Sequence, residues 1–240
     1  MDVSAGARVV RGARLGESDC ELLRDALLAQ PVNAITSLAF VVVAAGIAIA
    51  TVRAPIDRLR SAIFAVCLAS IGLGSFLYHG PQPSGSQELH DLPILLTVTS
   101  IAIWNLRLVT RVVRHDLVVL AVAAVVFGSI TAIDVRLVPA LTGFMIGAAV
   151  ALELVVATRG LRPIDGRRHR RAEASMFGVA AVAVSTWLLG RTGSPVCAPD
   201  AIFQFHGLWH LASAVLLALW WRLAFWLPPA GSTNNVARSL

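Results

Sequence analysis

The chain has 240 residues, of which 57% are hydrophobic and 14% are charged, and its mean hydropathy is +0.74. This composition excludes a water-soluble domain with a charged surface and indicates an integral membrane protein. The formal net charge of +6 reflects 20 basic against 14 acidic residues, and we attribute it to arginines that meet anionic lipid headgroups, not to nucleic-acid binding.

The predicted elements, in chain order, begin with a polar tail. Residues 1–18 lack the apolar stretch of a signal peptide, and we interpret 1–30 as a tail that ends in a short interfacial helix at 19–30. Seven runs then have the length of about 20 apolar residues that a helix needs to cross a bilayer. They cover 33–52, 59–79, 91–110, 116–133, 137–158, 173–190 and 205–226. The sequence predicts an all-α bundle of seven membrane-spanning helices in one domain, 31–228, followed by a tail at 229–240.

Arginine lies in alternate gaps between these runs and orients the bundle. The arginine-rich gaps are those at 53–60, 107–114 and 159–171. The other gaps, 81–90, 134–136 and 191–204, carry at most one arginine each. Because arginine-rich loops stay in the cytoplasm, we predict an outside N-terminus and a cytoplasmic C-terminus. The abundance of Arg, Ala and Val, with no Lys, favours the inner membrane of a bacterium.

Polar side chains recur near the predicted outer ends of three runs. Ser75 and His79 end the second run, Asp91 begins the third, and His206 and His210 begin the seventh. Residues four apart share a helix face, so the Ser75/His79 and His206/His210 pairs can converge on one point. Ionisable groups are costly in hydrocarbon, and their recurrence at matched depth favours a shared function.

Three imidazoles leave one position of a tetrahedral zinc open, which is typical of a catalytic site. In this interpretation His79, His206 and His210 bind zinc, and a zinc-bound water attacks a carbonyl carbon. Asp91 would act as general base and then acid, and Ser75 would donate a hydrogen bond to the oxyanion. Two alternatives stay open: a receptor-like or scaffold protein with structural zinc, and a bis-histidine haem protein for electron transfer, which gives Asp91 and Ser75 no role.

Several stretches resemble the alkaline ceramidase family, which belongs to the CREST superfamily of seven-span membrane hydrolases. These stretches are Cys20 with Glu21, QPVNAITS at 30–37, GLGSFLYH at 72–79, HDLP at 90–93 and FHGLWH at 205–210. The resemblance implies a zinc-dependent amidase whose histidines bind the metal and whose Ser and Asp assist hydrolysis. It implies a ceramide-like substrate that enters from the outer leaflet and is split into a fatty acid and an amine. Other N-acyl or ester lipids present the same carbonyl, and no protein partner is implied.

Four further residues are candidates to support the metal ligands. Asn33 and Ser37 share a helix face and match the family pattern, although they could instead bond a neighbouring helix. Trp209 lies between the paired histidines, and His90 precedes Asp91. The family register could place the catalytic position at His90. We choose Asp91, because a carboxylate suits proton transfer, with His90 beside it.

Animal ceramidases resemble this chain least at their calcium site. They form that site from an acidic N-terminal stretch together with a Glu before the first span. Here Gln30 stands in the place of that Glu, and Asp19 and Glu21 are the anionic candidates that remain. A hard cation takes several carboxylate or carbonyl oxygens, so this departure argues against calcium. Cys20 and Cys197 are both predicted outside. The resemblance implies a disulfide between them, and two unpaired thiols are the alternative.

Overall fold

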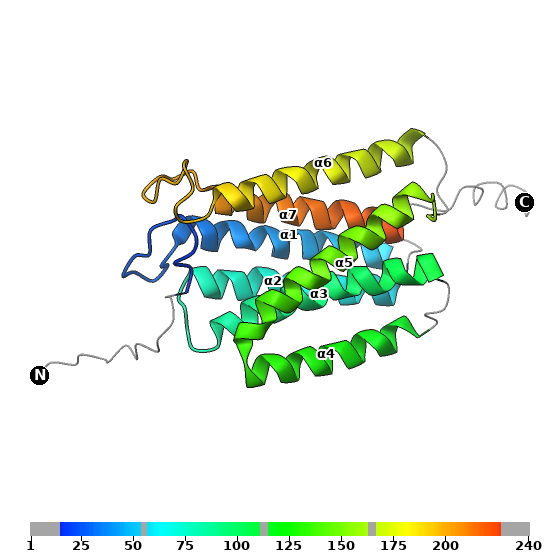
Figure 1. Cartoon of the computed structure of the whole chain (residues 1–240), viewed down its shortest axis with the longest axis horizontal. Coiled ribbons are helices and arrows are strands. Elements are labelled where there is room, and N and C mark those ends of the chain that lie inside the picture. The colour runs from blue at the N-terminus through cyan, green and yellow to red at the C-terminus, as the bar shows by residue number, and fades with distance from the viewer. Residues whose placement is uncertain (1–14, 54–56, 111–114, 163–166, 227–240) are drawn as a thin grey trace, which may run out of the picture.

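A computed structural model describes residues 15–53, 57–110, 115–162 and 167–226 (Figure 1). The helices are α1 (Pro31–Arg53), α2 (Arg58–His79), α3 (Ser86–Thr110), α4 (Asp116–Ile133), η1 (Val135–Leu137), α5 (Val138–Thr158), α6 (Arg167–Leu189), α7 (Phe205–Trp221) and η2 (Arg222–Trp226). Seven helical stretches are long and apolar enough to cross a membrane. The predicted all-α, seven-span bundle is thereby confirmed. The tail predicted at 229–240 lies outside the described residues.

The helices pack as a bundle with α1 and α7 near its middle (Figure 1). Helix α1 contacts α2 and α7, α2 contacts α3, and α3 contacts α4 and α5, while α6 packs on α7. The core between them is apolar and aromatic, with Phe40, Phe64, Leu68, Trp104 and Trp220 among its buried side chains. Burial of these side chains fixes the positions of α1, α2, α3 and α7, the four helices that carry the site.

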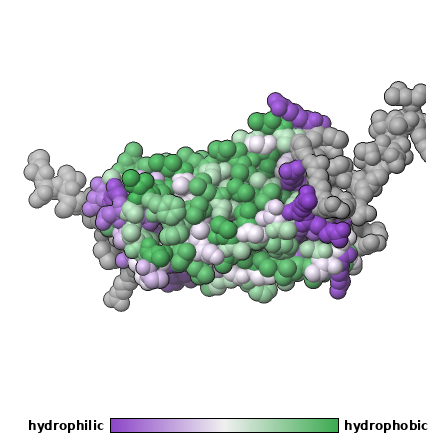
Figure 2. Space-filling model, turned by 90° about the horizontal axis from the view of Figure 1, so that it is seen from above, coloured by the Kyte–Doolittle hydropathy of each residue, from purple (hydrophilic) through white to green (hydrophobic). Residues whose placement is uncertain are grey.

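The outer surface of the bundle is hydrophobic around its middle. Figure 2 shows this band between two ends where hydrophilic residues gather. Its exposed side chains include Val42 on α1, Val66 on α2, Val125 on α4, Phe144 on α5 and Val184 on α6. Soluble monomers rarely expose apolar patches of this size, whereas a bilayer covers them, and helices satisfy their own backbone groups there. The chain is therefore a multi-pass membrane protein.

A buried carboxylate ties three helices together at one end of the bundle. Glu153 on α5 accepts hydrogen bonds from Asn105 on α3 at 2.9 Å, from Trp220 on α7 at 2.9 Å and from Arg162 at 2.8 Å. All four side chains are buried. Ionised groups inside a membrane protein need partners of this kind, and this cluster holds the end of the bundle that lies away from residues 15–30.

Helix α3 begins at Ser86, five residues before the predicted start at 91, and places His90 and Asp91 in its second turn. Pro93 has no N–H to donate to the Leu89 carbonyl, and that carbonyl lies against Gly74 on α2. A Cβ at Gly74 would come within 1.8 Å of the Leu89 oxygen. The absence of a side chain at Gly74 therefore lets α3 approach α2 closely, and brings His90 next to His79.

Residues 15–30, which we call the N-terminal segment, lie across the end of the bundle (Figure 1). The short helix predicted at 19–30 is wrong, because these residues are irregular. Their backbone donors reach distant acceptors: Cys20 N donates to Gly190 O at 2.8 Å, Leu22 N to Pro199 O at 3.0 Å and Gln30 N to His79 O at 2.7 Å. A disulfide also joins Cys20 to Cys197. These long-range contacts override the local helix propensity.

Candidate metal centre

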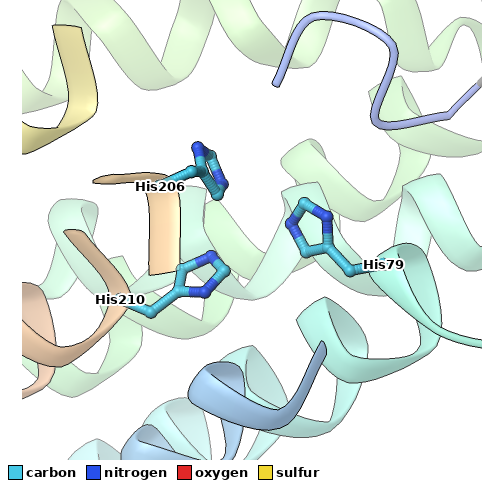
Figure 3. Close-up of side chains that lie close together, drawn as sticks. All are labelled: His79, His206 and His210. Carbon is cyan, nitrogen blue, oxygen red and sulfur yellow. The ribbon is translucent and has the colours of Figure 1, made fainter. Parts of the chain in front are cut away.

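Three histidines meet at the end of the bundle that the N-terminal segment crosses. His79 is the last residue of α2, while His206 and His210 lie in the first two turns of α7. One ring nitrogen from each lies within 4.8 Å of the other two, and the rings face a common point (Figure 3). Ring centroids are 5.2 Å apart for His79 and His206, 5.3 Å for His79 and His210, and 4.7 Å for His206 and His210. All three side chains are buried.

Two glycines allow the neighbouring helices to approach the first turn of α7. A Cβ at Gly190, just after α6, would lie 2.5 Å from the backbone nitrogen of His206. A Cβ on Gly207 would lie 3.1 Å from the hydroxyl of Thr36 on α1. Real Cβ atoms are rarely this close to other heavy atoms, so side chains at these positions would push α6 and α1 away from the histidines.

Gln30 fixes the proton on His79. Its amide nitrogen donates to the carbonyls of Gly16 at 3.0 Å and Glu21 at 2.7 Å, so the other amide atom must be the oxygen. That oxygen lies 2.7 Å from Nδ1 of His79 and can only accept. His79 therefore carries its proton on Nδ1, and its Nε2 keeps a free lone pair.

The other two imidazoles also have Nδ1 beside an oxygen. The Thr36 hydroxyl donates to the Val32 carbonyl at 2.7 Å, so it accepts from His210 Nδ1, 3.1 Å away. Nδ1 of His206 lies 3.2 Å from a carboxylate oxygen of Asp19, in contact but outside hydrogen-bond geometry. Oxygens on the far side of each ring are the arrangement that orients metal-bound histidines in proteins.

The Nε2 atoms of His79, His206 and His210 are buried and have no hydrogen-bond partner among the residues that the structure describes. A buried nitrogen with no partner is costly, and three of them facing one point are costlier still. A divalent metal ion relieves this cost, because neutral imidazole is a preferred ligand of zinc and three imidazoles leave one position open. The residues present therefore fit a zinc ion.

The carboxylates considered for calcium have other partners. Glu21 accepts hydrogen bonds from the backbone N–H groups of Val32 and Asn33, both at 2.8 Å, and so satisfies the first turn of α1. Asp19 pairs with Arg191 at 3.2 Å and contacts His206. Burial raises the pKa of Asp19 to about 6, against the opposing pull of the Arg191 guanidinium. Through its contact with His206, Asp19 directly touches one of the three candidate zinc ligands.

The hydroxyl group of Ser37 lies between Ser75 and His210 in a chain of hydrogen-bond contacts. Ser75 Oγ is 2.7 Å from Ser37 Oγ on α1, and Ser37 Oγ is 3.4 Å from Nδ1 of His210. Ser37 donates its only proton to the Asn33 carbonyl at 2.7 Å, so Ser75 is the donor in the hydroxyl pair. Both serines are buried.

His90 and Asp91 form a hydrogen-bonded pair beside the histidines, with His90 Nδ1 2.6 Å from Asp91 Oδ1. The His90 ring stacks on Tyr78, with centroids 4.4 Å apart, and stands perpendicular to His79 at 6.0 Å. Of the two, His90 is the residue whose ring contacts a histidine of the centre.

The remaining candidates also lie at this end of the bundle. Trp209 has its ring 4.9 Å from that of His206 and 5.1 Å from that of His210. Asn33 is fully buried, and neither atom of its side-chain amide has a hydrogen-bond partner. The sequence interpretation missed Thr36, although its place between the candidates Asn33 and Ser37 was a usable signal.

Residues 24–229 match the model of the family described as Ceramidase. The match spans all seven helices, including Ser75, Asp91 and the three histidines, and begins after Asp19 and Glu21. No curated protein matches the chain.

Proposed function

The chain belongs to the ceramidase family, a family of lipid-amide hydrolases, and on this premise we propose that it is a zinc-dependent hydrolase of a ceramide-like lipid amide. The observation that supports zinc binding is the convergence of three buried imidazoles, whose Nε2 atoms have no hydrogen-bond partner among the described residues. The products would be a fatty acid and an amine.

His79, His206 and His210 would hold the zinc ion. Bound there, zinc supplies a Lewis acid that polarises the amide carbonyl and makes water a better nucleophile at neutral pH. Gln30, Thr36 and Asp19 keep the three rings in place from the far side. Their oxygens also favour the tautomer with a bare Nε2.

Ser75 would donate a hydrogen bond to the oxygen that gains negative charge in the transition state. Its proton is directed at Ser37 in the substrate-free arrangement. Rotation about the Cβ–Oγ bond redirects that proton without movement of the helix. A donor held beside the reacting carbonyl in a dry site is a large contribution to amide hydrolysis.

Proton transfer between water and the leaving amine is assigned to the pair formed by His90 and Asp91. The pair lies beside His79, and His90 Nδ1 is 2.6 Å from Asp91 Oδ1, within hydrogen-bond distance. Amide hydrolysis needs such a group, because an amine leaves only after its nitrogen is protonated.

The membrane supplies the substrate. We propose that residues 31–228 form the hydrolase domain, completed by the N-terminal segment, in the inner membrane of a bacterium with the centre on the outer side. The arginine-rich gaps belong to the ends of helices that lie away from the histidines (Figure 1), which supports this orientation. A lipid would enter sideways and keep its acyl chain among the helices.

Two other functions keep some support from the histidines. A scaffold with structural zinc uses the same three ligands, and differs by lacking turnover. A haem with two axial histidines leaves the third imidazole without a role, and all three converge here.

One experiment separates these functions. Protein purified in detergent is assayed for zinc per chain, for haem absorbance and, by mass spectrometry, for fatty acid released from ceramide. We expect about one zinc ion per chain and hydrolysis in the wild type, and neither in His210→Ala. His115→Gln is the matched control, because His115 is exposed and makes no side-chain hydrogen bond at the start of α4. Zinc without hydrolysis would support a scaffold, and hydrolysis without zinc would refute the metal assignment.

A further inference from the structure

His90 and Asp91 contact each other although they are consecutive residues of one helix. Neighbours on an α-helix point about 100° apart and do not normally face one another. Here the two side chains turn together, so that His90 Nδ1 lies 2.6 Å from Asp91 Oδ1. This contact fixes which nitrogen of His90 carries the proton, because an ionised carboxylate can only accept.

Asp91 is engaged on both oxygens by residues of α3 itself. Oδ1 accepts from His90, and Oδ2 accepts from the amide of Gln87 at 3.4 Å. Gln87 lies one turn earlier on the helix, so the carboxylate is held along the surface of α3. These two contacts orient the Asp91 carboxylate towards its own helix.

The His90 ring contacts two rings that belong to the end of α2. Tyr78 stacks on it, with centroids 4.4 Å apart and planes 25° apart, while His79 stands perpendicular at 6.0 Å. Tyr78 is itself fixed, because its hydroxyl accepts a hydrogen bond from the backbone N–H of Gly16 at 3.1 Å. The close approach of α3 to Gly74 keeps the whole arrangement in register.

We propose that His90 is the catalytic acid and base of this site, acting through Nε2, and that Asp91 is a positioning residue that orients it. The inference rests on the proposed function and assigns its proton transfer to a single atom. With Nδ1–H bonded to Asp91, Nε2 has the free lone pair. A carboxylate behind an imidazole is the arrangement by which hydrolases hold a histidine in the productive tautomer and stabilise its protonated form.

The proposed step balances as follows. A water molecule forms a bond from its oxygen to the carbonyl carbon and gives one proton to His90 Nε2. His90 Nε2 then returns that proton to the amide nitrogen as the C–N bond breaks, so that the products are a fatty acid and a free amine. Asp91 keeps its negative charge throughout and offsets the positive charge on the imidazolium between the two transfers.

The test compares His90→Gln, Asp91→Ala and the double variant, with His115→Gln as the control histidine away from the centre. His90→Gln is expected to lower kcat by about 10²–10⁴-fold, the usual contribution of general acid–base catalysis, with little change in KM. Asp91→Ala is expected to cost less. The double variant is expected to be no slower than His90→Gln, because Asp91 has nothing to orient once His90 is gone.

Two readouts separate chemistry from folding. Zinc per chain and the thermal unfolding temperature, measured on every variant, should match the wild type if His90 does not hold the metal. An ester analogue of the lipid should lose less rate than the amide in His90→Gln, since an alkoxide leaves with less need of a proton. If His90→Gln fails to fold, His90→Asn is measured by the same criteria.

Each outcome decides the assignment. A larger loss for Asp91→Ala than for His90→Gln, with the double variant equal to Asp91→Ala, would show that Asp91 is the base and overturn the inference. Loss of zinc in His90→Gln would make His90 a metal ligand and overturn it as well. A wild type that binds no zinc, or cleaves no lipid amide, would instead refute the proposed function itself.

Discussion

Replacing Gln30 by Leu tests whether the N-terminal segment holds the metal centre together. Gln30 is fully buried and makes three hydrogen bonds, one from His79 Nδ1 at 2.7 Å and two to the carbonyls of Gly16 and Glu21. Leucine is close to glutamine in size but offers no polar atom. The substitution removes all three hydrogen bonds and leaves His79 free to turn or to change tautomer.

The structure sets the expected size of the effect. Side chains that support metal-bound histidines typically contribute about 10–100-fold in metal affinity, which corresponds to about 1.4–2.8 kcal/mol. We therefore expect Gln30→Leu to weaken zinc binding by that factor. The protein should also lose stability, because the buried Glu21 carbonyl loses the Gln30 donor, a loss that costs about 1–3 kcal/mol. The Gly16 carbonyl loses the same donor but keeps the backbone N–H of Asp19.

Chelator competition measures the zinc affinity, and thermal unfolding of the detergent-solubilised protein measures the stability. Gln30→Glu should keep most of the zinc affinity, because a carboxylate still accepts from His79, while losing stability because it cannot donate to the two carbonyls. Gln82→Leu is the matched control. Gln82 donates to the carbonyls of Leu15 and Tyr78, and these side-chain hydrogen bonds, the ones it makes among the described residues, involve no imidazole. Equal zinc affinity in Gln30→Leu, Gln82→Leu and wild type would refute the role of Gln30.

Two further outcomes follow from the bonds at the opposite ends of the bundle. Cys197→Ser removes the disulfide to Cys20 and should cost about 2–5 kcal/mol of stability, seen as a lower unfolding temperature under non-reducing conditions; an unchanged temperature would contradict this. Glu153→Gln takes away the nearer carboxylate of the buried Arg162 and leaves it the more distant one of Glu173, 3.7 Å away, so it should cost up to about 3–5 kcal/mol. Zinc content and kcat of the folded protein should stay at wild-type values in Glu153→Gln, and a selective loss of zinc there would contradict the separation of the two ends.

The membrane makes most of this fold predictable from the sequence. Hydrocarbon offers no partner for backbone N–H and C=O groups, so long apolar runs must be helices, and the seven runs marked the seven helices. The N-terminal segment obeys a different rule. Its helix-forming composition led to the wrong prediction of a helix at 19–30. Its backbone groups instead bond to Gly190, Pro199 and the end of α2, residues that no local pattern connects to it.

The candidate site was predictable to the extent that helix periodicity governs it. The four-residue spacing of His206 and His210 places both on one face, and in the structure they meet His79. The partners of the imidazoles follow no such spacing, since Gln30 and Asp19 come from the irregular segment and Thr36 from the first helix. The orientation of Asp91 towards His90 depends on side-chain rotamers, which the order of residues on α3 does not specify.

The centre joins His79 at the end of α2 to residues from the first and last parts of the chain that the structure describes. Asp19 and Gln30 come from the N-terminal part of the sequence, and His206 and His210 come from its C-terminal part. The disulfide between these parts spans a sequence separation of 177. During biosynthesis the ribosome releases these parts far apart in time. His206 and His210 can therefore reach His79 only after α7 has been inserted, so the three histidines come together once the last of the seven helices is in place.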